Sequence, residues 1–371
     1  MMHTKALKIL IAPDKFKGSL GAIEVAEAIA RGINKQSTLH QIVTQPMADG
    51  GDGSIDLLAQ LEQLTQHTVR VHDPLFRLID AVYYSQDDTA FIEMAKASGI
   101  ALLTSQEKNC LKTTSLGTGE MILDAIRQGF RKINLFIGGS ATNDAAMGIA
   151  HALGYEFLDQ NQQALEPIGG NLEHIVALQR GNTNINLQKV EFQVVCDVNN
   201  PFFGERGAAY VYGPQKGANP AQVAQLDKGL RNVHQVFLEA NLTDVQTLPG
   251  AGAAGGIGGG MVALFGAKLV SGIQLFIDLF GLEAKIQQAD VVITGEGQLD
   301  DQSLQGKVVG GVGKLCEKYQ KPMIVVCGQN KLTTGVQIRE VRAIMEYTQE
   351  VEEAIAKAAG FLEQIGEELK L

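Results

Sequence analysis

Short apolar runs of this chain lead repeatedly into loops that carry glycine together with hydroxyls, amides, carboxylates or lysines. After the run KINLFI, Gly138 and Gly139 allow a tight turn, and Ser140, Asn143 and Asp144 follow before a helical pattern begins. A strand, a glycine turn and a helix N-terminus present free backbone N–H groups, which bind anions. A well-capped turn without any ligand explains the same residues. The stretch alone does not decide between the two interpretations.

Two lysines follow the first apolar run of the chain. Lys15 and Lys17 lie between a predicted strand, Lys8–Ala12, and a helix for which Ser19 is the predicted N-cap. In an open α/β sheet, ligands bind beyond the carboxyl ends of the strands. The lysines are therefore candidate contacts for an anionic ligand, with solvated surface residues as the alternative.

The segment MADGGDG places two carboxylates around a glycine turn. Asp49 and Asp52 have the chemistry to hold a magnesium ion through water. Aspartate and glycine are also favoured turn residues. Taken alone, the segment favours the turn.

Asp197 and Lys216 follow two further predicted strands. Phe192–Cys196 reads as a buried strand, and the irregular Asn199–Pro201 segment comes after Asp197. An acid in this place commonly meets a metal ion or a proton-transfer partner, although an Asx turn explains it as well. The segment AAYVYGPQKGA predicts another short strand with Lys216 in the loop that follows.

The segment PGAGAAGGIGGGMVALFGA is the most glycine-rich of the chain. Gly250, Gly252 and Gly255 match the spacing of a dinucleotide-binding fingerprint, but Pro249 precedes them and no strand leads in, so we do not interpret them as one. Close approach of this backbone to a ligand phosphate, or to a neighbouring segment, explains the glycines equally well.

These loops require an α/β scaffold with an inserted part. Strand–loop–helix units occur at both chain ends, whereas residues 67–103 alternate apolar and polar side chains as in antiparallel strands. Near the C-terminus we expect a strand at Ala289–Thr294, a polar GEGQLDDQS loop, a helix at 308–319 and a strand at 322–327. An amphipathic helix follows, with one face formed by Val351, Ile355, Ala358 and Phe361.

Composition excludes several classes of protein. A chain of 371 residues favours two domains, and its formal charge of −10 without a basic block argues against nucleic-acid binding. Four cysteines without metal-ligand spacing make structural zinc and a disulfide framework unexpected. No apolar run is long enough to span a bilayer and the N-terminal patch is too short for a signal peptide, so we expect a cytoplasmic protein with no membrane partner. No feature of the sequence fixes the number of subunits.

The loop inventory is typical of phosphate handling with magnesium. The chain has neither a GxxxxGK[ST] motif nor an HRD catalytic loop. A phosphotransferase with this sequence is therefore neither a P-loop enzyme nor a protein kinase.

Nine segments together resemble the bacterial glycerate kinase family, over residues 8 to 330. They are APDKFKGSL, PMADGGDGS, IEMAKASGIALL, TTSLGTGEMI, IGGSATNDAA, CDVNNPFFG, YGPQKGA, PGAGAAGGIGGG and ITGEGQLDDQS. The resemblance implies an ATP-dependent kinase of D-glycerate, with phosphorylation at the 2-hydroxyl favoured over the 3-hydroxyl. It also implies a Rossmann-like three-layer domain from both chain ends, residues 1–68 and 286–371, with a second α/β domain inserted at 69–285. The active site is expected in the cleft between them.

The resemblance suggests a role for each loop. Lys17 and Asp197 are the predicted catalytic residues, Asp197 as general base, and Asp49 and Asp144 are the predicted magnesium ligands. The predicted substrate and phosphate contacts are Lys15, Ser19, Gly138, Gly139, Ser140, Asn143, Lys216, Gly252, Gly255, Gly295 and Glu296. Family members often have arginine where this chain has Gln298, so we assign no phosphate role to Gln298.

Two other functions are compatible with parts of the sequence. One is a nicotinamide-dependent oxidoreductase acting on a small hydroxy acid, favoured only by the GAGAAG match. The other is a non-catalytic sensor of sugar acids, against which the abundance of loop carboxylates speaks.

Overall fold

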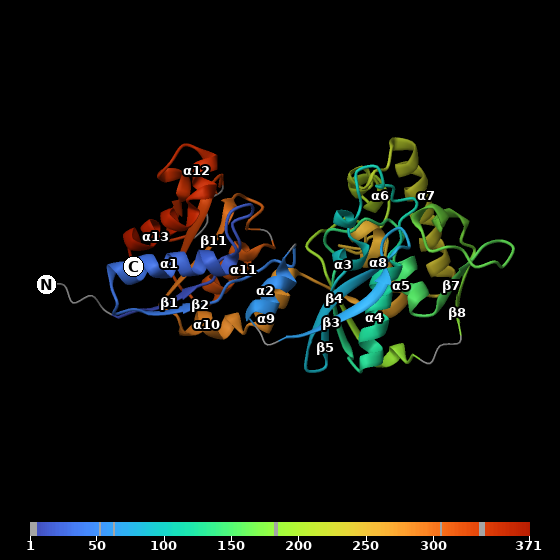
Figure 1. Cartoon of the computed structure of the whole chain (residues 1–371), viewed down its shortest axis with the longest axis horizontal. Coiled ribbons are helices and arrows are strands. Elements are labelled where there is room, and N and C mark those ends of the chain that lie inside the picture. The colour runs from blue at the N-terminus through green and yellow to red at the C-terminus, as the bar shows by residue number, and fades with distance from the viewer. Residues whose placement is uncertain (1–5, 52, 62–63, 182–184, 305, 334–337) are drawn as a thin grey trace. The chain divides into compact units, whose positions relative to one another are not determined.

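The computed structural model describes residues 6–51, 53–61, 64–181, 185–304, 306–333 and 338–371. This part of the chain divides into two units, each with its own sheet (Figure 1). Unit 1 is Met1–Leu57 with Ser271–Leu371, and unit 2 is Leu58–Val270. The chain therefore passes between the units at residues 57/58 and 270/271. The boundaries expected from the sequence were 68/69 and 285/286.

The sheet of unit 1 is parallel throughout and combines the two ends of the chain. Its strand order is β13-β12-β11-β1-β2. The bounds are β1 Lys8–Ile11, β2 Gln41–Thr44, β11 Val291–Leu299, β12 Met323–Asn330 and β13 Glu340–Ala343. Ile9 of β1 pairs with Val291 of β11, so neighbouring strands lie far apart in sequence.

Helices cover both faces of this sheet, which gives the expected three-layer α/β arrangement. Apolar side chains of α1 and α13 pack with Ile9, Ile11 and Ile293 on one face, while α10 and α11 contact β1 and β11 from the other (Figure 1). The bounds are α1 Ala22–Gln36, α2 Ser54–Leu61, α9 Gly272–Leu279, α10 Leu282–Gln288, α11 Val308–Lys318, η5 Ile344–Glu346, α12 Val351–Ala356 and α13 Ala358–Glu368.

Unit 2 contains a mixed sheet, in the order β10-β9-β6-β5-β4-β3. β3, β4 and β5 run antiparallel, as the alternating pattern of residues 67–103 predicted, and β5, β6, β9 and β10 are parallel. The bounds are β3 Thr65–His72, β4 Leu78–Gln86, β5 Thr89–Glu93, β6 Lys132–Phe136, β9 Glu191–Val195 and β10 Lys268–Val270. A separate hairpin pairs β7 Tyr155–Leu158 with β8 Ala177–Arg180.

The helices of unit 2 pack against this sheet and against one another. They are α3 Ala95–Ser98, α4 Leu116–Gln128, α5 Met147–Ala152, α6 Ala208–Tyr212, α7 Pro220–Glu239 and α8 Ala253–Phe265. Short 3₁₀ turns lie at Ile100–Leu102, Gly169–His174, Leu187–Lys189 and Pro214–Lys216. Gly129 ends α4 in the left-handed region, at φ 109°.

The segment AAYVY is a helix, α6, and not the strand predicted from its composition. Ala208 and Ala209 are buried in the core of unit 2, whereas Tyr210 and Val211 are exposed. Burial of adjacent small residues fits one side of a helix and not the alternation of a strand. Tertiary packing thus overrides the preference of tyrosine and valine for strands.

Three expectations near the pocket described below were also wrong. α1 begins after Gly21, not after Ser19, and Ser19 Oγ instead donates to the Ile355 carbonyl at 2.7 Å. β11 continues through GEGQL, where a loop was predicted, because these residues pair with β12. The predicted C-terminal helix is two helices that meet at Lys357, and Val351 is exposed rather than buried.

Candidate active site

The carboxyl ends of β1, β2, β11 and β12 gather charged residues around a pocket of about 490 Å³ in unit 1. Parallel strands end at the same edge of a sheet, which is where α/β proteins bind ligands. Asp14, Lys15 and Lys17 follow β1, Asp49 follows β2, and Glu296 belongs to β11. The structure thus brings together four of the residues predicted from sequence and adds Asp14.

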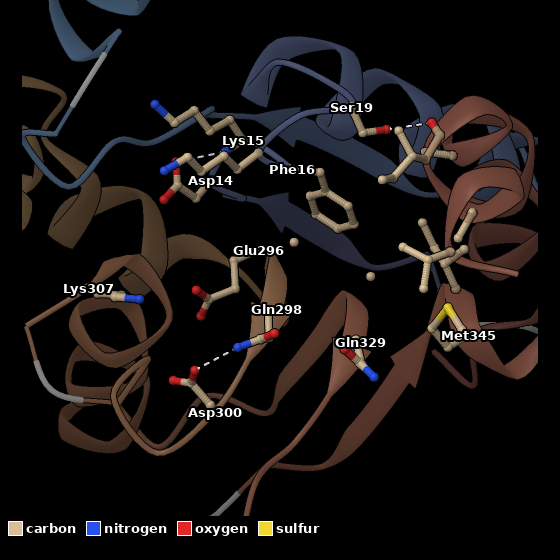
Figure 2. A pocket seen from close by; sticks show the side chains of 18 of the residues that line it. Asp14, Lys15, Phe16, Ser19, Glu296, Gln298, Asp300, Lys307, Gln329 and Met345 are labelled. Atoms are coloured by element: carbon tan, nitrogen blue, oxygen red, sulfur yellow. Dashed lines mark hydrogen bonds between the residues drawn. The ribbon is translucent and has the colours of Figure 1, made fainter. Parts of the chain in front are cut away.

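The pocket is polar at one end and apolar at the other. Figure 2 shows Asp14, Lys15, Glu296 and Lys307 grouped on one side and Met345 on the opposite side. Phe16 lies between the two groups (Figure 2). Ser19, predicted as a phosphate contact, also lines the pocket.

Three carboxylates at the polar end influence one another. Burial, together with the nearby Asp49 carboxylate, raises the pKa of Asp14 to about 7, against a lowering effect of Lys15. Burial also raises the pKa of Glu296, which Lys307 opposes. The Oε1 atom of Glu296 is buried, and within the described ranges it has no hydrogen-bond partner. Cationic groups, or a proton, would stabilise this end of the pocket.

Asp49 forms the turn that its sequence context favours. Its Oδ1 accepts from the Gly51 backbone N–H at 3.0 Å, and Gly50 has a φ of 87°. Asp52 lies outside the described residues. Among the residues that are described, no three His, Cys, Asp or Glu side chains converge closely enough to hold a metal ion by themselves. A cation at Asp49 would need ligands from a substrate or from water in addition.

In unit 2, a buried lysine holds the Ser140 loop. Lys216 Nζ donates to Ser140 Oγ at 2.7 Å and to the Thr142 carbonyl at 2.6 Å. Burial lowers the pKa of Lys216 to about 8, although Cys110 and Asp144 oppose the shift. Both of these hydrogen bonds of Lys216 hold the loop that contains Ser140 and Thr142.

The expected anion site at the start of α5 contains the protein's own carboxylate. Asp144 is fully buried, and its Oδ2 accepts from the Ser115 N–H, the Ser115 hydroxyl and the Gly148 N–H. Ser115 Oγ accepts from the Ile149 N–H at 3.1 Å. Internal groups thus satisfy these N–H donors, whereas the other carboxylate oxygen of Asp144, Oδ1, is buried and has no hydrogen-bond partner within the described ranges. The anion site and the magnesium role of Asp144 stay predictions.

Three of the predicted glycine contacts lie against other backbone segments. A Cβ on Gly252 would come within 2.2 Å of the Pro201 carbonyl oxygen, and one on Gly255 within 2.2 Å of that of Thr142. A Cβ on Gly295 would come within 2.0 Å of the Val326 carbonyl oxygen. Close packing, the second of the two explanations left open for the glycine-rich segment, therefore accounts for Gly252 and Gly255, and close packing accounts for Gly295 as well.

The remaining predicted residues of unit 2 surround the carboxyl ends of β6 and β9. Gly138 and Gly139 are exposed, and Asp197 is exposed two residues after β9 ends. Asn143 is fully buried, and neither polar atom of its amide has a hydrogen-bond partner within the described ranges. The structure thus places the predicted residues in two sets, one in each unit.

Sequence reasoning missed several residues that line the pocket. Asp14 carried a usable signal, because it directly follows the first strand beside the two predicted lysines. Lys307, Gln329 and Met345 carried none, since only the fold brings them to this pocket. Gln298, to which no phosphate role was assigned, also lines it and donates to Asp300 Oδ2 at 3.0 Å.

Residues 9–370 match the sequence profile of the glycerate kinase family. The chain belongs to this family. It is 41% identical to the glycerate 2-kinase of Escherichia coli over 332 residues, which cover 89% of this chain and 87% of that protein. It is 33% identical to the glycerate kinase of Neisseria meningitidis over 363 residues, 96% of each chain.

A solved structure agrees with the family assignment. The fold matches a crystal structure from Salmonella typhimurium, described as a putative glycerate kinase 2, with a TM-score of 0.86 and 36% sequence identity. The match covers 98% of this chain and 97% of the other.

The glycerate kinase family is a family of enzymes, and the chain is accordingly a kinase. The oxidoreductase alternative is not supported. The non-catalytic sensor is not supported either, because members of this family are enzymes. Consistent with this, Gly250 and Gly252 lead into a kinked start of α8 and not from a strand into a regular helix. None of the helices in the described ranges is long and apolar enough to span a bilayer.

Proposed function

We propose that this glycerate kinase transfers the γ-phosphoryl group of ATP to the 2-hydroxyl of D-glycerate, with magnesium as the metal. Membership of the family supports the reaction, and the name of the Escherichia coli relative supports the 2-position. The single structural observation that carries the proposal is the pocket of unit 1, where lysines and carboxylates share one end. Triphosphate and a magnesium ion need both kinds of group at close quarters.

The lysines of this pocket are the proposed phosphate ligands. Lys15 and Lys17 approach from the loop after β1, and Lys307 from the start of α11. Cations held in this way stabilise the charge that develops on the transferring phosphoryl group. Lys17, the residue predicted to be catalytic, keeps that proposed role.

Asp49 and Glu296 are the proposed magnesium-binding carboxylates of unit 1. The buried Oε1 of Glu296 and its raised pKa fit a position that a cation would stabilise. Magnesium usually takes one or two carboxylates together with phosphate oxygens and water, which agrees with the absence of a closed ligand set in the described residues. When bound, the ion would neutralise charge on the phosphates.

Unit 2 is proposed to contribute the groups around Ser140 and Asp197. Gly138 and Gly139 are exposed at the end of β6, in a loop that Lys216 holds by hydrogen bonds to Ser140 and Thr142. A rigid loop of this kind can present backbone N–H groups to a carboxylate substrate. Asp197 remains the proposed general base, and the active site between the two units remains a proposal.

The test is conversion of D-glycerate by the purified protein with ATP. We expect ADP and 2-phosphoglycerate, identified by phosphorus NMR of the product, and loss of turnover when a chelator removes magnesium. Formation of 3-phosphoglycerate would correct the position of transfer. ATP hydrolysis that does not depend on glycerate, as the only activity, would overturn the proposal.

A further inference from the structure

The apolar end of the pocket in unit 1 is not explained by phosphate chemistry. It is formed by Phe16, Met345 and residues of α12, among them Val351 and Ile355. Val351 is 58% exposed and Ile355 44% exposed, although both are large and apolar. Exposed apolar side chains that line one concave surface commonly mark a binding site.

This apolar end is fixed to the phosphate end by a direct contact. Ser19, in the loop that carries Lys15 and Lys17, donates its hydroxyl hydrogen to the Ile355 carbonyl at 2.7 Å. Phe16 in the same loop is buried between the two ends (Figure 2). The spacing between the lysines and α12 is therefore held by a short, hydrogen-bonded loop.

We infer that the adenine base of ATP binds between Phe16, Met345 and α12, with the triphosphate directed toward Lys15, Lys17 and Lys307. The inference rests on the proposed kinase function and adds the orientation of the nucleotide. A planar apolar base suits the apolar end, and the anionic triphosphate suits the cationic end of the same cavity. The volume of about 490 Å³ lies within the range of small-molecule sites. The amide of Gln329, between the two ends, can donate to or accept from the nucleoside.

The absence of tryptophan from the chain provides a direct test. Ile355→Trp introduces a single fluorophore on an exposed part of α12, and the backbone carbonyl that Ser19 contacts is retained. We expect ATP and adenosine each to change its emission, whereas inorganic tripolyphosphate, tested with magnesium, leaves the emission unchanged. Leu39→Trp is the matched control, because Leu39 is also exposed and in unit 1 but lies outside the pocket. No ligand should change its emission.

A kinetic measurement adds an independent readout. Ile355→Asp places a charge where the base would bind, so KM for ATP should rise roughly tenfold or more while KM for glycerate stays unchanged. Leu39→Asp should change neither value. Val351→Trp at the rim repeats the fluorescence test if Ile355→Trp itself obstructs the site.

The outcomes separate the inference from the proposed function. Two results together would place the base elsewhere. The first is that Ile355→Asp turns over glycerate with an unchanged KM for ATP. The second is that saturating ATP changes the emission of neither Ile355→Trp nor Val351→Trp. If tripolyphosphate changes the emission of Ile355→Trp as much as ATP does, the triphosphate and not the base lies at α12, which would contradict the inferred orientation. Failure of the wild-type protein to phosphorylate glycerate would refute the proposed function, whereas an adenosine response would still support a base site.

Discussion

At the scale of single residues, Asp197 combines a rigid support with an exposed carboxylate. β9 is paired on both sides, with β6 and β10, and Val194 and Val195 within it are buried. The backbone of Asp197 is therefore close to the end of a strand that is paired on both sides. An alcohol that attacks phosphorus must transfer its proton, and an ionised aspartate can accept it.

Replacement of Asp197 by asparagine tests this role. Asp197→Asn keeps the shape and removes the charge, so we expect kcat to fall about 10²–10⁴-fold, with little change in ATP binding or stability. Asp80→Asn, an exposed carboxylate of the same unit, is the control and should leave kcat unchanged. If Asp197→Asn retains near-normal kcat, the base lies in unit 1, where Asp14 with its pKa of about 7 is the first candidate. Loss of magnesium-ATP binding would instead make Asp197 a metal-site residue.

Burial of Lys216 makes the stability of the protein depend on pH. Its pKa is about 8 in the folded protein, against 10.5 for an unperturbed lysine. Between these values the folded state releases a proton that the unfolded state keeps, so stability rises with pH. Below pH 8 the ammonium is charged in both states, and the unfavourable effect of burying it is fully present.

The prediction is a comparison of wild type with Lys216→Met. From pH 8 to above pH 10, the free energy of unfolding of the wild type should increase relative to the variant by about 3 kcal/mol at most. Urea unfolding across this range measures the difference. Burial raises the pKa of Cys110, which by itself lowers stability with rising pH, but Cys110 is present in both proteins and its contribution largely cancels in the comparison. A constant difference between the two proteins would show that Lys216 does not titrate in this window.

At the scale of elements, close packing of α9 positions the Asp49 turn. A Cβ on Gly272, the first residue of α9, would come within 1.9 Å of the Asp49 carbonyl oxygen and 2.5 Å of Gly50 Cα. These are backbone atoms, which cannot rotate away as a side chain can. The glycine therefore allows a helix start to support the turn that carries a proposed magnesium ligand.

Gly272→Ala should displace this turn. We expect a loss of roughly 1–3 kcal/mol in stability from overpacking and a weaker response of activity to magnesium, both measurable on the purified variant. Gly360→Ala is the control, since Gly360 is also helical and in unit 1 but a Cβ there would meet nothing within 4 Å. It should be neutral or slightly stabilising. Equal behaviour of the two variants would contradict the supporting role of α9.

Elements with a clear periodic pattern were predictable from sequence, and those defined by tertiary contacts were not. α11 and the antiparallel strands β3 and β4 agree with the expectations because their burial follows the period of the element. β1 agrees because a short apolar run marks a buried strand. α6 and the extension of β11 differ because neighbouring segments decide them. The same holds for the site. Asp14 follows β1, and Glu296 follows the predicted strand Ala289–Thr294, so both are recognisable in principle. Met345 and Lys307 reach the pocket only through the fold.

At the scale of the whole chain, the two units differ in how their sequences are arranged. All strands of the mixed sheet, and both apolar clusters that surround it, come from within residues 58–270. The sheet of unit 1 needs both chain ends, since β1 lies between β2 and β11. Unit 2 is thus contiguous and unit 1 is not.

A fragment of residues 58–270 should therefore fold without the rest of the chain. We expect native-like circular dichroism and a cooperative urea transition, as for small single domains. Residues 6–57 alone, which lack β11 and α13, should remain unfolded and serve as the comparison. An unfolded 58–270 fragment would mean that unit 2 depends on unit 1 for its stability.

The pairing of β1 with β11 also sets an order of events on the ribosome. Lys8 donates its backbone N–H to the Asp290 carboxylate, which is 282 residues away. At roughly 5–20 residues per second, the nascent N-terminal segment waits on the order of tens of seconds for its partner strand. During that interval the apolar face of α1, with Val25, Ile29 and Ile33, has no α13 to cover it. This segment is thus synthesised long before its partner and is among the last to be buried, so it is the segment that a chaperone would find exposed.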